Sequence, residues 1–154
     1  MRDRWRPIGV LAGVLFAVNV VARLLTRFAF DEDPVAADRV SLAMFLVIGV
    51  ILAAVTFTWA RRSAVAQWGG DLAAAVGAAM LATILVGPLL VGNNPFAGGA
   101  GTFFAQLGLY LLATGAGILI GYLIATALGV DHRSQQLKRY AEVKNTKPRR
   151  PVRR

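Results

Sequence analysis

The sequence contains no cysteine, and this absence excludes several kinds of site at once. No structural disulfide, thiolate nucleophile, iron–sulfur cluster or cysteine zinc site can form. The chain also has a single histidine, His132, and charged residues make up only 16% of it. No Asp or Glu lies within its long apolar runs, so no catalytic triad, metal-ligand cluster or carboxylate pair can assemble at one depth. We therefore expect a protein that is not an enzyme and that binds no metal or other cofactor.

Apolar residues dominate the 154-residue chain: 56% are hydrophobic and the mean hydropathy is +0.58, which is too apolar for a soluble domain. They gather in four blocks, each long enough to cross the ~30 Å of hydrocarbon in a bilayer. The predicted fold is an all-α integral membrane protein in which four transmembrane helices form a bundle at residues 8–129. The four spans cover about residues 8–26, 40–60, 72–91 and 103–128.

Two shorter features frame these spans. A basic head, residues 1–7, precedes the bundle, and a basic tail, residues 130–154, follows it and is predicted to be disordered. Asp33 and Pro34 precede the second block as an N-cap and a first-turn proline, so that helix is expected to begin outside the lipid.

The distribution of Lys and Arg predicts the orientation, because basic residues accumulate in cytoplasmic segments. Fourteen of the 17 lie in the head, in the loop with Arg61 and Arg62, and in the tail, whereas the first opposite loop carries the acidic run 31–33 and Asp38. Both termini are therefore predicted to be cytoplasmic. The three tryptophans fall at the same interface, where an indole ring can be buried while its N–H stays hydrated: Trp5, Trp59 and Trp68.

The first block has a second interpretation as a secretory signal, because Val20, Val21 and Ala22 loosely resemble a cleavage site. Cleavage would leave three spans in the same orientation. Arg23 and the branched valines make a poor site, so we favour the uncleaved form. The 26 alanines, and 14 arginines against 3 lysines, indicate a GC-rich genome and favour the plasma (inner) membrane of a bacterium. No internal repeat is evident.

Small residues recur every four positions in the fourth block and predict a face for close helix packing. These residues are Ala113, Gly117, Gly121, Ala125 and Gly129. Shorter stripes follow the same spacing at Gly9, Gly13 and Ala17, and at Ala74, Ala78 and Ala82. Packing within the bundle explains any one stripe best. A single monomer cannot easily cover all three, so self-association or contact with another membrane protein is also predicted.

Polar residues within the spans are few, and polar groups in hydrocarbon tend to face protein or water. Asn19, Arg23 and Arg27 share one face of the first helix, and Arg23 lies about 22 Å along it from Ile8. A second stripe in the fourth span contains Gln106, Tyr110 and Thr114. We favour an arginine that snorkels towards the acidic loop as the explanation of the first stripe, and hydrogen bonding between helices alone as the explanation of the second. The alternative is that the two stripes face each other across an outward-opening polar cleft for an anionic headgroup or substrate.

The loops between the spans offer no further site. The uncharged, glycine-rich loop 92–101 is expected to be a flexible connection. The acidic run 31–33 is interpreted as electrostatic capping of a helix rather than a metal site, because calcium needs six to eight oxygens in a shaped loop.

The tail carries nine basic residues and is predicted to contact anionic lipid at the cytoplasmic surface. The residues assigned to this contact are Lys138, Arg139, Lys144, Lys147, Arg149, Arg150, Arg153 and Arg154. Leu137, Tyr140 and Ala141 suggest a short amphipathic continuation. Nucleic-acid binding is disfavoured because no folded reader or aromatic platform accompanies the charge.

These features favour a small non-enzymatic membrane protein that acts as an accessory or scaffolding subunit through its small-residue helix faces. The alternative is a homo-oligomeric small transporter or channel component that uses the polar cleft. The absence of a carboxylate within the spans argues against a proton-coupled exporter.

Overall fold

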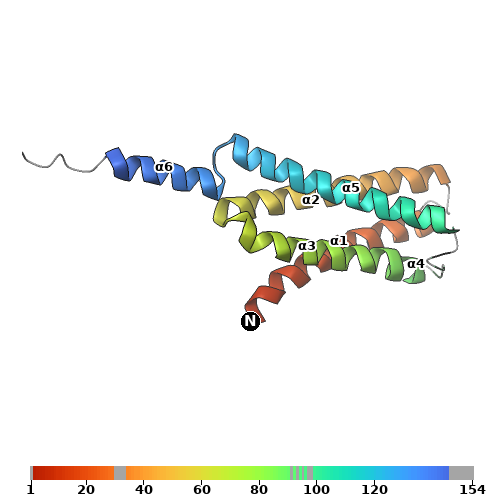
Figure 1. Ribbon diagram of the computed structural model, residues 1–154. Coiled ribbons are helices and arrows are strands. Elements are labelled where there is room, and N and C mark those ends of the chain that lie inside the picture. The colour runs from red at the N-terminus through yellow and green to blue at the C-terminus, as the bar shows by residue number, and fades with distance from the viewer. Residues whose placement is uncertain are drawn as a thin grey trace, which may run out of the picture.

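A computed structural model describes residues 2–29, 34–90, 92, 94, 96 and 99–145, and every regular element in these residues is helical (Figure 1). The elements are α1 (Arg2–Ala29), α2 (Pro34–Arg62), α3 (Val65–Leu81), the π-helical turn η1 (Ala82–Val86), α4 (Gly87–Leu90), α5 (Gly99–Ala127) and α6 (His132–Asn145). The predicted acidic run 31–33 lies outside the described residues, as do residues 93, 95, 97 and 98 of the loop 92–101.

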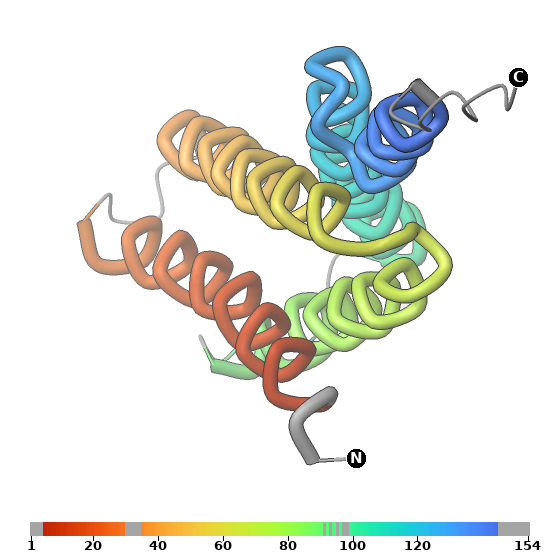
Figure 2. The backbone as a smooth tube through the Cα atoms, turned by 90° about the vertical axis from the view of Figure 1, so that its left-hand side faces the viewer, coloured from red at the N-terminus to blue at the C-terminus, as the bar shows by residue number. Residues whose placement is uncertain are grey.

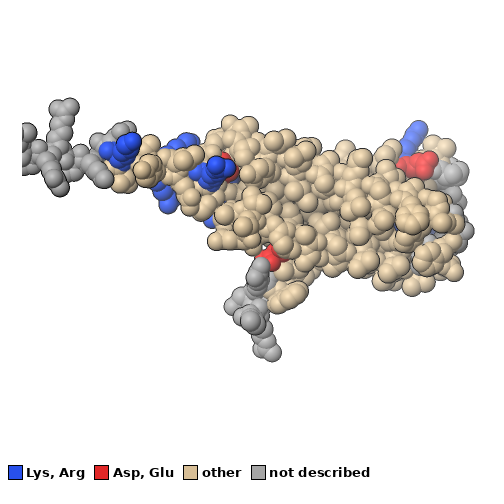
Figure 3. All heavy atoms as spheres, in the orientation of Figure 1, with Lys and Arg blue, Asp and Glu red and all other residues tan. Residues whose placement is uncertain are grey.

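Four segments are long and apolar enough to cross a membrane, as the sequence predicted. They begin and end at Trp5–Ala29, Val35–Arg62, Val65–Leu90 and Gly99–Lys144, the last of which joins α5 and α6. The helices extend beyond the predicted apolar blocks, because backbone hydrogen bonding continues where the side chains become polar. Pro34 is the first residue of α2, the position that the sequence assigned to it. Figure 3 shows a wide band free of Lys, Arg, Asp and Glu between charged ends.

The long helices pack in a ring-like order in which α5 contacts α2, α2 contacts α1, and α1 contacts α3, with a smaller contact between α3 and α5 (Figure 2). The interior contains apolar side chains with no exposed surface, among them Leu15, Ile48 and Leu52. Many large apolar side chains point outward instead; Leu42 is 68% exposed and Leu112 is 70% exposed. A surface of this kind suits contact with lipid chains.

The third membrane-spanning segment changes its helical pitch at η1. There the N–H of Gly87 donates to the carbonyl of Ala82, five residues earlier, which is the hydrogen bond of a π-helix. Pro88 explains the change, because it has no N–H to give and its ring crowds the carbonyl of Ile84 four residues earlier. The wider turn buries Thr83 and Ile84.

Helix α5 ends at a left-handed glycine. Gly129 has φ +60°, its N–H donates to Thr126 O at 2.9 Å, and the N–H of Val130 donates to Ala125 O at 3.1 Å. This is the Schellman pattern, in which the glycine follows the C-cap residue of the helix, here Leu128. The structure thus differs from the prediction that placed Gly129 in the packing stripe, because the last residue of α5 is Ala127.

The prediction of a disordered tail is wrong for residues 132–145, which form α6. Asp131 caps this helix: its Oδ2 accepts a hydrogen bond from the Ser134 N–H at 3.2 Å. Sequence reasoning gave too much weight to the high charge of the tail and too little to the helix-forming residues after Asp131. Residues 146–154 lie outside the described part of the chain.

The start of α1 and helix α6 lie at the same end of the long helices, and α6 extends away from that end (Figure 1). The connection between α2 and α3 is at this end too. Here Trp59 and Trp68 make an edge-on ring contact at 6.4 Å, and Trp68 Nε1 donates to Ser63 O at 3.3 Å. The opposite end holds the start of α2 and of α5, and it is there that the polar side chains meet.

Candidate functional site

A cavity of about 460 Å³ lies among α1, α2, η1 and α5, in the half of the helices farthest from α6. Its lining includes five of the residues assigned to the predicted cleft: Asn19, Arg23, Arg27, Gln106 and Tyr110. The two polar stripes predicted from sequence therefore meet at one cavity. Much of the remaining wall is formed by Thr83 and by six residues of α2: Ala37, Asp38, Val40, Ser41, Met44 and Phe45.

Asn19 fixes the wall formed by α1. It is 2% exposed, its Nδ2 lies 3.1 Å from Met44 Sδ, and its Oδ1 accepts a hydrogen bond from Arg23 Nε at 3.1 Å. The contact with Met44 joins α1 to α2, and the contact with Arg23 holds the guanidinium beside the cavity. Arg23 uses only Nε for Asn19, so the four N–H donors on its two Nη atoms are not needed for this contact.

Gly87 makes room for this pair. A Cβ added at Gly87 would stand 2.9 Å from Arg23 Nε and 2.9 Å from Asn19 Oδ1. Carbon atoms do not approach polar side-chain atoms so closely without displacing them. The absence of a side chain at Gly87 therefore lets the Asn19–Arg23 pair lie directly against the third membrane-spanning segment.

Two buried hydroxyls face each other at the inner part of the cavity. Tyr110 is 1% exposed and Thr83 is 5% exposed, and their hydroxyls are neighbours. Neither Tyr110 Oη nor Thr83 Oγ1 has a partner of good hydrogen-bonding geometry within the described part of the chain. Buried polar atoms are nearly always paired, and an unpaired one costs about 1–3 kcal/mol. These two atoms therefore favour a polar occupant, either water or a ligand.

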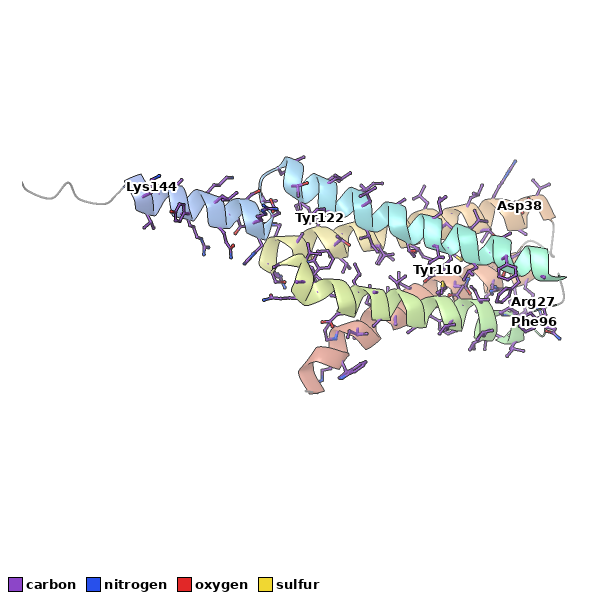
Figure 4. The ribbon with its side chains drawn as sticks, viewed as in Figure 1. Arg27, Asp38, Phe96, Tyr110, Tyr122 and Lys144 are labelled. Carbon is purple, nitrogen blue, oxygen red and sulfur yellow. The ribbon has the colours of Figure 1, made fainter. Side chains whose placement is uncertain are left out.

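The outer part of the cavity is more exposed and carries charge. Arg27, Asp38 and Gln106 are exposed residues of its lining, and the Arg27 guanidinium lies 5.9 Å from the Phe28 ring centroid. Figure 4 shows Arg27 and Asp38 at the end of the molecule opposite Lys144, with Tyr110 deeper among the helices. Because the charged lining residues are two arginines and one aspartate, the cavity has an excess of positive charge.

Thr114 does not line the cavity. Its hydroxyl donates to the carbonyls of Tyr110 at 2.8 Å and Leu111 at 3.1 Å, within its own helix. The four-residue spacing correctly placed Thr114 on the buried face of α5, where it is 2% exposed. The spacing could not reveal that the backbone of the preceding turn satisfies the hydroxyl.

The predicted packing stripe of α5 lies against α2. A Cβ at Gly117 would stand 2.9 Å from Gly49 Cα, and a Cβ at Gly121 would stand 2.8 Å from Ala53 Cα. Ala113 contributes its carbonyl to the same contact, and Ala125 is fully buried. The partner of this stripe is therefore a second small-residue pair, Gly49 and Ala53, which the sequence analysis did not single out.

The shorter stripes of small residues lie in open surroundings. A Cβ at Gly9 or Gly13 of α1 would meet nothing within 4 Å, and Ala74 and Ala78 of α3 are exposed. These two faces thus remain uncovered by other helices in the described part of the chain.

The basic residues assigned to lipid contact fall into two groups. Lys138 donates from Nζ to Gly129 O at 3.1 Å, and Arg139 is exposed on α6. Lys144 is exposed near the end of the same helix (Figure 4). Lys147, Arg149, Arg150, Arg153 and Arg154 lie outside the described residues. Contact of this segment with anionic lipid stays a prediction.

Sequence reasoning missed three residues that shape the cavity: Thr83, Gly87 and Met44. Thr83 offered a signal, since it is the one hydroxyl in the third predicted span. Gly87 next to Pro88 offered a weaker one. Met44 looks like any other apolar residue of a membrane helix and gave no signal.

Comparison with known proteins finds no match for this chain: no protein family, no curated protein sequence and no solved structure is significantly similar to it.

Proposed function

We propose that this membrane protein binds an anionic group in the polar cavity, as a component of a small transporter or channel. The observation that carries the proposal is a pair of buried hydroxyls, Tyr110 and Thr83, that lack a partner of good geometry among the described residues and lie on the wall of a cavity that also contains Arg23. Two hydroxyls and a guanidinium are hydrogen-bond donors, and donors of this kind recognise phosphate and carboxylate oxygens. The proposed role is binding, because the lining supplies hydrogen-bond donors and positive charge.

The orientation of the site supports a ligand from outside the cell. The count of Lys and Arg favours a cytoplasmic location for both termini. With α6 at the cytoplasmic end, the cavity opens in the outer half of the plasma membrane of a GC-rich bacterium.

The absence of native cysteine makes this orientation simple to test. Gln67→Cys lies in the first turn of α3, near Trp68, and Ala100→Cys lies in the first turn of α5 at the other end; both positions are exposed. A membrane-impermeant maleimide added to intact cells should label Ala100→Cys alone. Labelling of Gln67→Cys alone would reverse the proposed orientation.

Ligand binding is best tested through thermal stability, because a ligand that binds only the native state raises the midpoint of unfolding. The purified full-length chain should be stabilised by sn-glycerol 1-phosphate and by inorganic phosphate, relative to chloride at equal ionic strength. Arg23→Gln should abolish the stabilisation, since it removes the charge while keeping a polar side chain beside Asn19.

Arg39→Gln is the matched control, because Arg39 is an exposed arginine at the same end that does not line the cavity. It should leave the stabilisation unchanged. An equal response in the wild type and in Arg23→Gln, or no response in the wild type, would contradict the proposal.

The uncovered small-residue faces of α1 and α3 favour a second candidate, an accessory subunit that docks against another membrane helix. Native mass spectrometry of gently extracted protein distinguishes the two. A stable complex with a different protein would support the accessory role, whereas a monomer would count against it.

A further inference from the structure

We propose that the occupant of the polar cavity is an outer-leaflet anionic lipid, whose headgroup sits beside Arg23 and whose acyl chain lies in a groove between α2 and α5. This inference rests on the proposed function of the cavity. The groove is a second binding surface that the polar stripes do not include. With both surfaces occupied, the ligand must be an amphiphile.

The groove is an apolar hollow of about 360 Å³ on the seam between α2 and α5. Its floor is formed by small residues, and its edges are formed by larger side chains that point away from the protein. The floor residues are Gly49, Ala53, Ala113, Ala116 and Gly117. Leu46, Val50 and Ile120 form the edges and are 67%, 60% and 52% exposed, so the groove opens towards lipid.

The groove and the polar cavity share one lining residue. Phe45 lines both, and on α5 the cavity residue Leu109 is followed one turn later by the groove residue Ala113. The two hollows are therefore neighbours, and in this proposal the lipid occupies both and passes Phe45 between them. A free phosphate ion has no acyl chain, so it would occupy the cavity and leave the groove empty.

The order of the two sites with depth matches a lipid of the outer leaflet. α2 and α5 run parallel, since Gly49 faces Gly117 and Ala53 faces Gly121. Both helices begin at the outer end in the proposed orientation, so the groove lies deeper in the membrane than the cavity. A lipid held there has its headgroup outward and its chain towards the bilayer centre, as it has in the leaflet itself.

The two sites make different contributions to binding. An acyl chain gains little hydrophobic free energy in the groove, because it leaves surroundings that are equally apolar. The excess of positive charge in the cavity selects the anionic headgroup, and so do the two buried hydroxyls, which lack a partner of good geometry among the described residues. The groove holds the acyl chain while the headgroup enters the cavity. A protein side chain that fills the groove would therefore keep the attached headgroup out of the cavity.

Ala116→Phe provides the test, because Ala116 is an exposed alanine of the groove floor. Ala78→Phe is the matched control, since Ala78 is an exposed alanine of α3 that lines neither hollow. Lipid binding to the full-length chain is measured by native mass spectrometry with dipalmitoyl phosphatidylglycerol, with phosphatidylcholine of the same chains, and with sn-glycerol 1-phosphate as the free headgroup.

We expect the wild type to prefer phosphatidylglycerol to phosphatidylcholine. Ala116→Phe should weaken phosphatidylglycerol binding about tenfold, because the phenyl ring takes the space of the acyl chain, while leaving binding of sn-glycerol 1-phosphate unchanged. Ala78→Phe should change neither. Equal lipid binding by Ala116→Phe and the wild type would overturn the groove assignment, and equal binding of the two lipids would overturn the preference for an anionic headgroup.

Arg23→Gln distinguishes failure of the lipid inference from failure of the proposed cavity function. If Arg23→Gln weakens binding of both the lipid and the free headgroup while Ala116→Phe weakens neither, the cavity function stands and the lipid inference fails. If Arg23→Gln changes neither, both fail.

Discussion

Gly121 of α5 lies directly against Ala53 of α2, so that a methyl group added at Gly121 would stand 2.8 Å from the Cα atom of Ala53. The atoms that it would meet belong to the backbone, which cannot rotate away as a side chain can. The contact therefore requires glycine, and it is one of the places where the two helices approach most closely.

Gly121→Ala should lower the stability of the protein by about 1–3 kcal/mol, the usual cost of adding a group to a fully packed contact. Gly115→Ala is the control, because a Cβ at Gly115 of the same helix would meet nothing within 4 Å. The control should be neutral or slightly stabilising, since alanine favours a helix more than glycine does. Unfolding of both variants in detergent provides the comparison, and equal stability would contradict the packing described for α2 and α5.

Tyr110→Phe should raise the stability of the ligand-free protein and weaken its binding of anions. The Tyr110 hydroxyl is buried without a partner of good geometry among the described residues, so its removal relieves a cost of about 1–3 kcal/mol. The same change removes a donor from the cavity. Tyr122→Phe on the same helix is the control, because Tyr122 does not line the cavity. A loss of stability in Tyr110→Phe would show that the hydroxyl is already paired.

Gly87→Ala should weaken anion binding while leaving the helices intact. The added methyl displaces the Asn19–Arg23 pair, whose atoms lie 2.9 Å from its position, and both partners are side chains that can move. Gly77→Ala in the same membrane-spanning segment is the control, since it would meet nothing within 4 Å. Circular dichroism checks the helices and phosphate-dependent stabilisation checks the site; unchanged stabilisation would mean that Gly87 does not position Arg23.

The start of α6 should depend on pH. Hydrogen bonding from Ser134 lowers the pKa of Asp131 below its ordinary value of 3.8, more than the opposing effect of burial raises it. The carboxylate therefore stabilises α6 fully above the ordinary carboxyl pKa, and this stabilisation is lost as the pH falls through the lowered one. The amide resonance of Ser134, followed by NMR through an acid titration, should shift with a midpoint below 3.8. A midpoint above that value would contradict the capping contact, and Asp131→Ser should remove the titration while keeping a neutral cap.

Much of the fold follows from the sequence because membrane insertion is governed by long apolar runs. The four spans and the first residue of α2 were predictable, since hydrophobic length and Pro34 are local signals. The extent of α6 was not, because its capping residue Asp131 had been counted only as a charge.

The site was predictable in part. Four-residue spacing predicts that Asn19 and Tyr110 lie on the polar faces of two helices. Polar groups in a membrane protein tend to face protein rather than lipid, so both side chains were expected to be buried, as they are. Spacing within one helix cannot report what a neighbouring segment contributes. The roles of Gly87 and Thr83 are therefore visible only in the structure, where the third membrane-spanning segment lies beside α1 and α5.

The close contact between α2 and α5 also has a consequence for biogenesis. Helix α2 leaves the ribosome early, but its tightest neighbour, α5, is the last of the four long helices to be made. Helices insert individually before they associate, so the Gly49 and Ala53 face of α2 must remain uncovered while α3 and α4 are synthesised. During that interval the nascent chain exposes a smooth helix face within the bilayer, and assembly of the protein is completed only when α5 enters beside it.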